Sequence, residues 1–344
     1  MDILESLKVV PKYDPEVIRS QQFSRLKGET YLDHAGAALH SDAQLAAVTS
    51  ELSTCLLGNP HSRNRPSETS TQILHATRQR ILQHFNTNDE EYAVIFTSGA
   101  SAAIKLVAEN LNWSSPCQES RHDGTTHCNC TELEPNNDKP WDSGKKTENN
   151  VMPPTKFTCY VYSQENHTSV LGVRGCAVSA GASVFSIPVK NIYEISKNNE
   201  INVSEKKTLQ EDPDVENCLF AYSAQCNYSG AKYPLSWVQR VRDGMLDDFV
   251  DSKTGKSGVT RRWFVLLDAA SFAATSPLDL STCTPDFVPV SFYKMFGYPT
   301  GLGCLLLHRR AWSVLNKRYF GGGTVELADA RSMRTVLRKL PSER

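Results

Sequence analysis

Lys294 stands where a protein amine could react with an aldehyde. It lies in the run SFYKMFG (residues 291–297), just past the apolar run 287–290 and just before a Gly/Pro turn. Partial burial among aromatic side chains disfavours the charged form of an amine, which makes this lysine a candidate Schiff-base former. Taken alone, an ordinary loop lysine is the simpler interpretation. The choice between the two depends on residues upstream.

Three polar side chains follow other apolar, strand-like runs. Asp268 ends one such run directly, and His167 and Asn227 come shortly after two others. A carboxylate can pair with a protonated ring nitrogen, and an imidazole can stack on a ring and carry protons near neutral pH. An amide can donate to a phenolic oxygen. Each residue also has a structural interpretation, as a capping aspartate, a packed histidine or a turn asparagine.

The run TSGAS (residues 97–101) lies between a strand-like run and a helix-like one. Backbone N–H groups at a helix N-terminus can hold a phosphate without a lysine. Gly99 permits close approach of a ligand, and the Ser98 and Ser101 hydroxyls add donors. An ordinary helix N-cap would explain the same residues.

Together these groups match the needs of a pyridoxal phosphate enzyme. Such an enzyme requires an aldehyde-trapping lysine, a carboxylate beside the pyridine nitrogen, a ring-stacking group and a phosphate cradle. Each candidate lies at the carboxyl end of a predicted strand, where ligands bind in open α/β sheets.

Seven short apolar runs are expected to be the strands that position these groups. Most are continuously apolar, which is typical of strands buried on both faces. Helix-period stretches lie between them, at 71–85, 100–110 and 235–249. The alternation predicts an α/β fold with a mostly parallel seven-stranded sheet flanked by helices. The runs cover residues 92–97, 157–163, 183–189, 218–222, 263–267, 287–291 and 303–307.

Two polar stretches, 113–156 and 190–216, interrupt this pattern. We expect them to be surface insertions that contribute little to a core. The first contains several metal-binding residue types, but their spacing fits no standard zinc finger and we predict no metal site. These residues are Cys117, His122, His127, Cys128 and Cys130.

Composition excludes several classes of protein. The 344 residues include 37 basic and 38 acidic ones, so charge gives no reason to expect a nucleic-acid or anionic-membrane partner. No apolar run has the length of a membrane span, and the first residues lack the pattern of a signal peptide. The ten cysteines have no regular spacing and are expected to be free thiols in a reducing compartment. We therefore expect a cytoplasmic protein.

The order of the motifs resembles a known family. TSGAS, ENHTSVLGVRG, QCNYSG, LLDAAS and SFYKMFGYPTGLG are similar to the class V aminotransferase group of fold type I pyridoxal phosphate enzymes, which includes cysteine desulfurases. YLDHAGAAL, GNPHSRN and SFYKMFGYPTG closely resemble the N-terminal domain of the eukaryotic molybdenum cofactor sulfurases. The resemblance implies an N-terminal segment at 1–30, a cofactor-binding domain at 31–325 and a divergent tail at 326–344.

The resemblance also implies a role for each candidate. Lys294 becomes the lysine that holds the cofactor's aldehyde, and Asp268 becomes the partner of the pyridine nitrogen. His167 becomes the ring-stacking and acid–base group, and Asn227 the contact to the phenolic oxygen. Thr324 matches a position that in dimeric relatives reaches the neighbouring subunit's phosphate. The phosphate site of the chain itself would use Ser98, Gly99, Ala100 and Ser291.

The implied reaction takes sulfur from L-cysteine. A protein cysteine attacks the sulfur of the substrate, which gives a protein persulfide and releases alanine. The sulfur then passes to the molybdenum cofactor used by xanthine dehydrogenase and aldehyde oxidase. The full-length relatives are implied to be homodimers.

The chain departs from this pattern after residue 325. The family's persulfide cysteine, substrate-binding arginine and C-terminal domain lie downstream, so we expect an incomplete product with most of the small domain missing and an apolar face exposed. Cys226 and Cys55 are weak substitutes, because proximity in sequence provides no mobile loop. Ser271 stands where many desulfurases have a glutamine. Two alternatives stay open: a non-catalytic product that binds cofactor or pairs with full-length subunits, and a class V lyase or aminotransferase.

Overall fold

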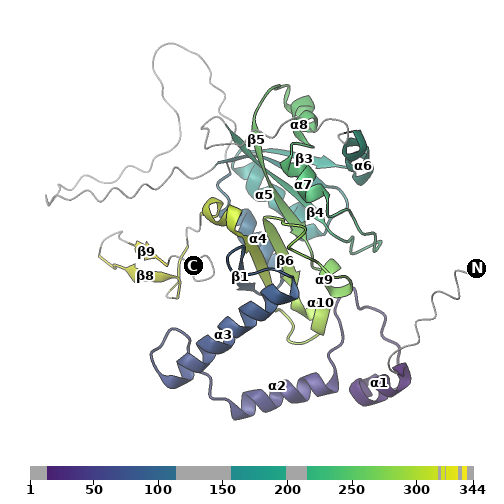
Figure 1. The fold of residues 1–344 in the computed structure, drawn as a ribbon, viewed down its shortest axis with the longest axis vertical. Helices are drawn as coiled ribbons and strands as arrows, with labels where there is room; N and C mark the ends of the chain where they lie inside the picture. Colours follow the sequence, from purple (N-terminus) through teal and green to yellow (C-terminus); the bar gives the residue numbers. More distant parts are fainter. Residues whose placement is uncertain are drawn as a thin grey trace, which may run out of the picture.

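All seven predicted strands are present and form one sheet (Figure 1). The computed structural model describes residues 14–113, 156–198 and 215–316, and most of 319–338. The strands lie in the order β1-β7-β6-β5-β4-β2-β3. Their bounds are β1 Tyr92–Thr97, β2 Phe157–Ser163, β3 Ser183–Ile187, β4 Glu216–Ser223, β5 Arg261–Asp268, β6 Phe287–Ser291 and β7 Gly303–His308.

Among the described strands of this sheet, β7 alone runs against the others. It pairs antiparallel with both β1 and β6, whereas β6, β5, β4, β2 and β3 pair in parallel in succession. The carboxyl ends of six strands therefore meet at one edge, which is where open α/β sheets bind ligands. The predicted mostly parallel α/β sheet is confirmed.

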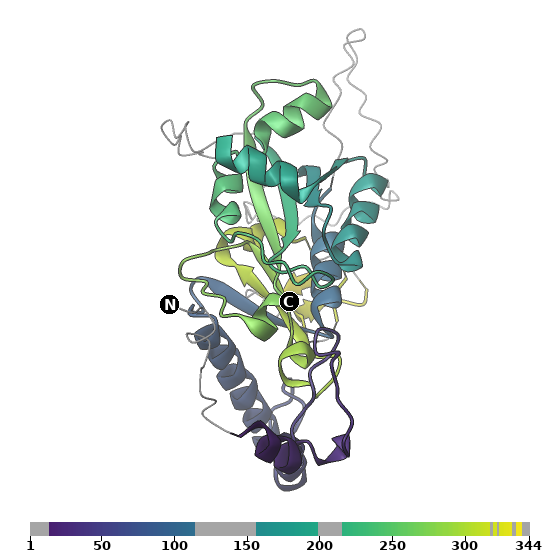
Figure 2. The same cartoon turned by 90° about the vertical axis from the view of Figure 1, so that its right-hand side faces the viewer.

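Helices cover both faces of the sheet (Figure 1; Figure 2). The helices that pack on it or extend from it are α3 Arg65–His84, α4 Ala100–Asn110, α5 Thr168–Ser179, α6 Val189–Asn198, α7 Trp237–Arg242, α8 Asp247–Thr254, α9 Phe272–Thr275, α10 Phe292–Phe296 and the 3₁₀ helix η3 Arg309–Val314. A separate hairpin pairs β8 Val325–Ala328 with β9 Thr335–Leu337.

The continuous apolar strands supply two cores, because successive side chains point to opposite faces. On β5, Trp263 and Val265 join the core under α3, α6, α7 and α8, whereas Phe264 and Leu266 join the core under α4, α5 and η3. All four of these side chains are buried. Burial on both faces explains why the strands lack the alternating pattern of a half-exposed sheet.

The helix predicted at 235–249 is two helices, α7 and α8. Gly244 lies between them with a φ of +92°, which L side chains rarely adopt. A Cβ at Gly244 would lie 2.7 Å from the Asp247 carboxylate, at the start of α8. Because the flanking Val241 and Val250 are both buried, the apolar period continues across the break and conceals it.

The second polar stretch also differs from the expectation. Its first part belongs to α6, in which Ile192 is completely buried. Ser196 of the same helix contacts Arg240 of α7, with the guanidinium Nη1 2.9 Å from the serine hydroxyl. Apolar residues three or four positions apart make this stretch amphipathic despite its charges. The remainder of this stretch up to residue 214, and residues 114–155 of the first stretch with their cysteines and histidines, lie outside the described residues.

The N-terminal part extends away from the sheet as an arm (Figure 1). It comprises α1 Pro15–Gln22, η1 Ser24–Leu26, α2 Asp42–Thr54 and the outer part of α3. Neither α1 nor α2 has a buried residue, and several large apolar side chains along the arm are exposed. These exposed side chains include Leu45, Leu52, Leu56, Leu57 and Ile73.

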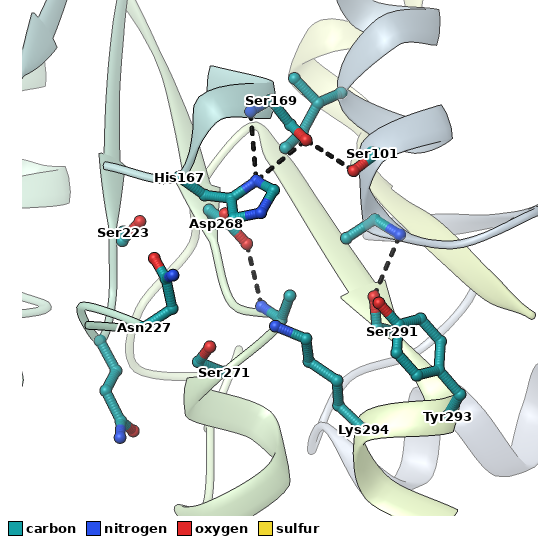
Figure 3. A pocket seen from close by; sticks show the side chains of 14 residues that line it. Ser101, His167, Ser169, Ser223, Asn227, Asp268, Ser271, Ser291, Tyr293 and Lys294 are labelled. Carbon is teal, nitrogen blue, oxygen red and sulfur yellow. Dashed lines mark hydrogen bonds between the residues drawn. The ribbon is translucent and has the colours of Figure 1, made fainter. Parts of the chain in front are cut away.

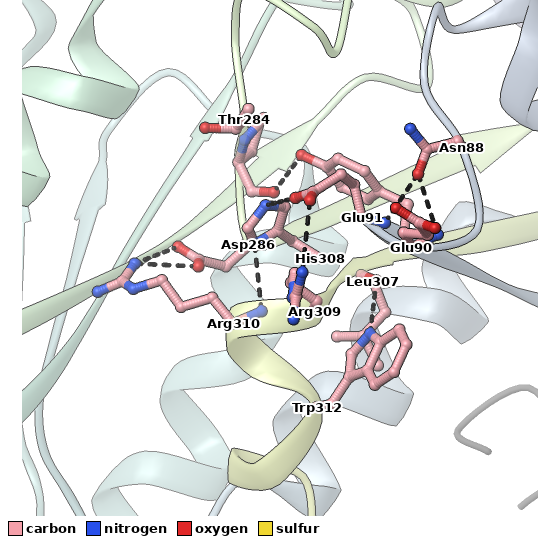
Figure 4. Close-up of polar contacts among 12 residues, drawn as sticks. Asn88, Glu90, Glu91, Thr284, Asp286, Leu307, His308, Arg309, Arg310 and Trp312 are labelled. Atoms are coloured by element: carbon pink, nitrogen blue, oxygen red, sulfur yellow. Dashed lines mark hydrogen bonds and ion pairs between the residues drawn. The ribbon is translucent and has the colours of Figure 1, made fainter.

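A buried ion-pair network lies just before the start of β6, around Asp286 (Figure 4). This residue precedes β6 and accepts hydrogen bonds from the Val265 backbone N–H at 2.8 Å and from Arg310 Nη1 at 3.0 and 3.3 Å. Arg242 Nη2 adds an ion pair at 3.1 Å. The second Arg310 amino group donates to the Trp263 carbonyl. The network therefore ties β5, β6, α7 and η3 together.

Candidate active site

A pocket of about 400 Å³ opens at the carboxyl edge of the sheet (Figure 3). Its walls come from the first turns of α4 and α5, the ends of β4, β5 and β6, and the turns that follow those strands. Among the predicted residues, the structure brings seven into the lining of this pocket. They are Ala100, Ser101, His167, Asn227, Asp268, Ser291 and Lys294.

The first turn of α4 forms one side of the pocket. Gly99 precedes this helix with a φ of +119°, so a side chain would be strained there. The Ala100 N–H donates to the Ser291 hydroxyl at 3.1 Å, which connects α4 to the end of β6. A Cβ at Gly303 would lie 2.7 Å from Gly99 Cα, so only glycine allows β7 to pack this closely. The helix N-terminus and the nearby hydroxyl groups can bind a phosphate-sized anion.

Lys294 projects into the pocket from α10 (Figure 3). It is half-buried beside Tyr293, which also lines the pocket. The backbone of residues 38–40 packs against the turn after the lysine. A Cβ at Gly297 would collide with the His40 backbone N, and the Ala38 N–H donates to the Tyr293 carbonyl. The motif around residues 31–40 thus supports the lysine's turn.

Asp268 ends β5 and faces the pocket almost completely buried, at 7% exposure. Burial raises the pKa of this carboxyl, and neither the Ala270 N–H donated to Oδ1 at 3.0 Å nor the charges of His167 and Lys294 reverse that shift. A buried carboxylate is stabilised by a cation or by several donors. The space beside Asp268 in the pocket therefore suits a ligand with a positively charged N–H group.

His167 caps α5 and reaches into the pocket (Figure 3). Its Nδ1 accepts the Ser169 backbone N–H at 3.1 Å and lies 3.0 Å from the Ser169 hydroxyl. The adjacent Asn166 joins β2 to β4: its Nδ2 donates to the Ser163 carbonyl at 2.7 Å and its Oδ1 accepts from Ser223 at 2.9 Å. This amide fixes the chain just before the histidine.

Asn227 lies in the turn after β4, on the side of the pocket opposite α4 (Figure 3). The turn is closed by backbone hydrogen bonds from Gly230 to Cys226 and from Cys226 to Ala231. Asn227 is exposed, so its amide is free to meet a ligand. Ser271 also lines the pocket, at the position where the resemblance implied a glutamine.

Three predicted residues do not line this pocket. Ser98 is exposed, and Gly99 acts through its backbone conformation at the start of α4. Thr324 closes a turn on Gly321, with its hydroxyl donating to the Gly321 carbonyl at 2.9 Å. Next to it, a Cβ on Gly323 would collide with the His61 ring, so the GNPHSRN motif packs against this turn.

Sequence reasoning missed several lining residues, among them Tyr293, Ser169 and Ser223. Tyr293 is adjacent to the lysine and points toward the start of α4 (Figure 3). Ser169 could have been found from its spacing, since a side chain at an N-cap accepts the N–H two or three residues later. Ser223 carries no such signal, because serine at a strand end is common.

Among the cysteines that the structure describes, Cys226 is adjacent in sequence to the lining residues Gln225 and Asn227. None of the seven described cysteines lines the pocket, and five of them are buried. Burial, the largest single effect, raises the pKa of the Cys226 thiol. Hydrogen bonds from Ser229 and Tyr228 together outweigh burial, so the pKa is lowered. Across residues 14–113, 156–198 and 215–316, we find no cluster of His, Cys, Asp and Glu arranged to bind a metal. The described helices include none long and apolar enough to cross a membrane.

Sequence comparisons identify relatives over most of the chain. A family model described as Aminotransferase class-V matches residues 30–129 and 255–343. The molybdenum cofactor sulfurase of Homo sapiens is 43% identical over 308 residues, which cover 89% of this chain and 29% of that protein. The molybdenum cofactor sulfurase of Oryza sativa subsp. japonica is 36% identical, over 90% of this chain and 34% of that protein. The chain therefore spans about a third of the length of these relatives.

Solved structures with a similar fold include cysteine desulfurases. The cysteine desulfurase CsdA from Escherichia coli matches with a TM-score of 0.61 and 18% identity, over 96% of this chain and 66% of that one. A cysteine desulfurase from Thermococcus onnurineus NA1 matches with a TM-score of 0.62 and 17% identity, over the same shares of the two chains. At these identities the likeness concerns the fold alone.

Proposed function

The chain belongs to the class V aminotransferase family, and from this premise we propose that it forms the pyridoxal phosphate domain of a molybdenum cofactor sulfurase. In the whole enzyme this domain takes sulfur from L-cysteine and passes it, through a protein persulfide, to the molybdenum cofactor. The observation that carries the proposal is the convergence of Lys294, Asp268, His167 and Asn227 on one pocket beside the N-terminus of α4.

The residues of the pocket fit the cofactor. Asp268 is a buried carboxyl with a raised pKa, so it would be stabilised by a protonated pyridine nitrogen. The first turn of α4, with Ala100 and Ser291, would hold the phosphate. Lys294 offers the amine for the aldehyde. Bound in this way, the cofactor supplies an electron sink for the substrate's amino acid carbons.

The chain's own groups would then position substrate and protons. His167 would lie over the ring and carry a proton at Nε2, the nitrogen that Ser169 leaves free. Asn227 would donate to the phenolic oxygen. The closed turn behind Lys294, fixed by Ala38 and His40, would keep the amine directed into the pocket.

Lys294→Ala tests the proposal. The purified chain is reconstituted with pyridoxal phosphate, reduced with borohydride and digested, and the labelled peptide is identified by mass. We expect the label on Lys294 and the loss of the visible absorbance band in the variant. Lys105→Ala is the matched control, because Lys105 is an exposed lysine on α4 whose side chain pairs with Glu109. A reconstituted wild-type chain with no such band, or a label on another lysine, would overturn the assignment.

A homodimer and a cytoplasmic location belong to the same proposal. The turn at Thr324 does not line the pocket of its own chain, which is compatible with a contact to a neighbouring subunit. The free state of the described cysteines suits a reducing compartment. Sedimentation of the full-length protein and fractionation of cells would test the two statements separately.

The position of the cysteines favours a second candidate function, in which the chain binds the cofactor but is not catalytic. Because no described cysteine lines the pocket, the chain would bind the cofactor without forming a persulfide on these residues. Incubation of the reconstituted chain with L-cysteine, followed by assays for alanine and sulfide, separates the two candidates. Sustained production of both would contradict the non-catalytic alternative, and a single turnover or none would support it.

A further inference from the structure

Ser169 holds one nitrogen of His167 with two groups at once (Figure 3). Its backbone N–H donates to Nδ1 at 3.1 Å, and its hydroxyl lies 3.0 Å from the same atom. A backbone N–H can act only as a donor, so Nδ1 must act as the acceptor. The imidazole proton of the neutral ring therefore resides on Nε2.

The same arrangement occurs a second time in this protein, at His308. This residue caps η3, and its Nδ1 accepts the Arg310 backbone N–H at 3.2 Å. Its Nε2 lies 3.4 Å from a carboxylate oxygen of Glu91, as expected if that nitrogen carries the proton. At His308 the capping N–H and Glu91 each meet one ring nitrogen, whereas at His167 the second group, the Ser169 hydroxyl, meets the same nitrogen as the capping N–H.

The Ser169 hydroxyl connects His167 to the side of the pocket that α4 forms. It lies 2.5 Å from the hydroxyl of Ser101, which is in the first turn of α4. If the Ser101 hydroxyl donates to the Ser169 oxygen, the Ser169 hydroxyl is free to donate its own proton to His167 Nδ1. If instead Ser101 donates to a bound anion, the Ser169 hydroxyl turns toward Ser101 and leaves Nδ1 with the backbone N–H alone.

We propose that Ser169 is a positioning residue that keeps the His167 proton on Nε2, facing the pocket, and links this proton to the occupancy of the α4 N-terminus through Ser101. The inference names a further residue of the proposed active site and in that sense rests on the proposed function. The arrangement itself requires neither cofactor nor turnover, so it can be tested independently of them.

The test is the tautomer of His167 in the chain without cofactor. Histidine labelled with ¹⁵N is observed by long-range ¹H–¹⁵N correlation at about pH 8, where an ordinary imidazole is neutral. The signals of His167 are those absent from His167→Gln. We expect the Nε2–H form in the wild type. In Ser169→Ala, loss of one of two donors to Nδ1 should raise the ratio of the Nδ1–H form about two- to tenfold.

Three variants make the result specific. Ser169→Thr keeps both the hydroxyl and the N–H and should restore the wild-type ratio. Ser101→Ala leaves Nδ1 as the acceptor of the Ser169 hydroxyl and should not raise the Nδ1–H form. Ser179→Ala, in the last turn of the same helix, removes a hydroxyl that contacts the Gly175 carbonyl and should change nothing. An unchanged ratio in Ser169→Ala, or the Nδ1–H form in the wild type, would overturn the proposal.

Discussion

Asp268 and Asp286 are buried aspartates of adjacent strands that are stabilised in different ways. Asp286 precedes β6, is fully buried, and contacts the guanidinium groups of Arg242 and Arg310 at 3.1 and 3.0 Å. Asp268 ends β5 at the pocket, where its side chain accepts the Ala270 N–H and no cation among the described residues comes within 4 Å. One carboxylate is neutralised by the protein, and the other is not.

The difference distinguishes a carboxylate whose partners the chain supplies from one whose pairing is incomplete. A buried charge persists only if it is paired, so the chain itself supplies the partners of Asp286 and thereby links β5 to β6, α7 and η3. Asp268 opens onto a pocket, and the pKa of its carboxyl is raised by burial. A partner from outside the chain would complete the pairing of this carboxylate. In the proposed function this partner is the ring nitrogen of the cofactor.

The largest effect is expected for Asp286→Asn. Removal of this charge leaves two guanidinium groups near the core without their counter-charge, which typically costs about 3–5 kcal/mol of stability. Denaturant unfolding of the chain without cofactor measures the loss. Asp248→Asn is the matched control, because Asp248 is an exposed residue of α8 and should change stability by less than about 0.5 kcal/mol. A loss at position 286 no larger than that of the control would show that the network does not stabilise the fold.

Asp268→Asn should leave the fold intact and weaken cofactor binding. A hydrogen bond to a charged group contributes about 1.5–3 kcal/mol, so the affinity for pyridoxal phosphate should fall about ten- to a hundredfold. Equilibrium dialysis gives the affinity, and circular dichroism verifies the fold. Wild-type affinity in Asp268→Asn would remove the distinction between the two aspartates, since neither would then interact with a ligand.

The strands could be predicted from the sequence because burial on both faces leaves a continuous apolar signature. Residues 92–97, 157–163 and 287–291 were predicted with their observed ends. The break at Gly244 was missed since it depends on backbone conformation within an unbroken apolar period. Helix α6 was missed for the opposite reason, because polar composition concealed its few buried positions.

The site could be predicted in part. Asp268 ends an apolar run, Lys294 and His167 come within a few residues of the ends of two others, and the parallel sheet brings such positions to one edge. The network at Asp286 gave no comparable signal, because its arginines come from positions 242 and 310 and meet only in the fold. Ser169 could be predicted from its spacing only once His167 is recognised as the N-cap of α5.

The smallest expected effect is the contribution of Asp268 to the pH dependence of the unfolding free energy. Because burial raises the pKa of Asp268, the folded chain without cofactor holds this proton at pH values where the unfolded chain has released it. Asp268 therefore makes stability fall as pH rises from about 4, the ordinary value for an aspartate, through its raised pKa. The amide of the variant Asp268→Asn has no such proton. The unfolding free energy of the variant minus that of the wild type should therefore increase with pH over this window. Any effect of the amide that does not depend on pH leaves the slope of this difference against pH unchanged. Unfolding at a series of pH values measures it, and a flat or falling difference would show that Asp268 is already compensated by the protein.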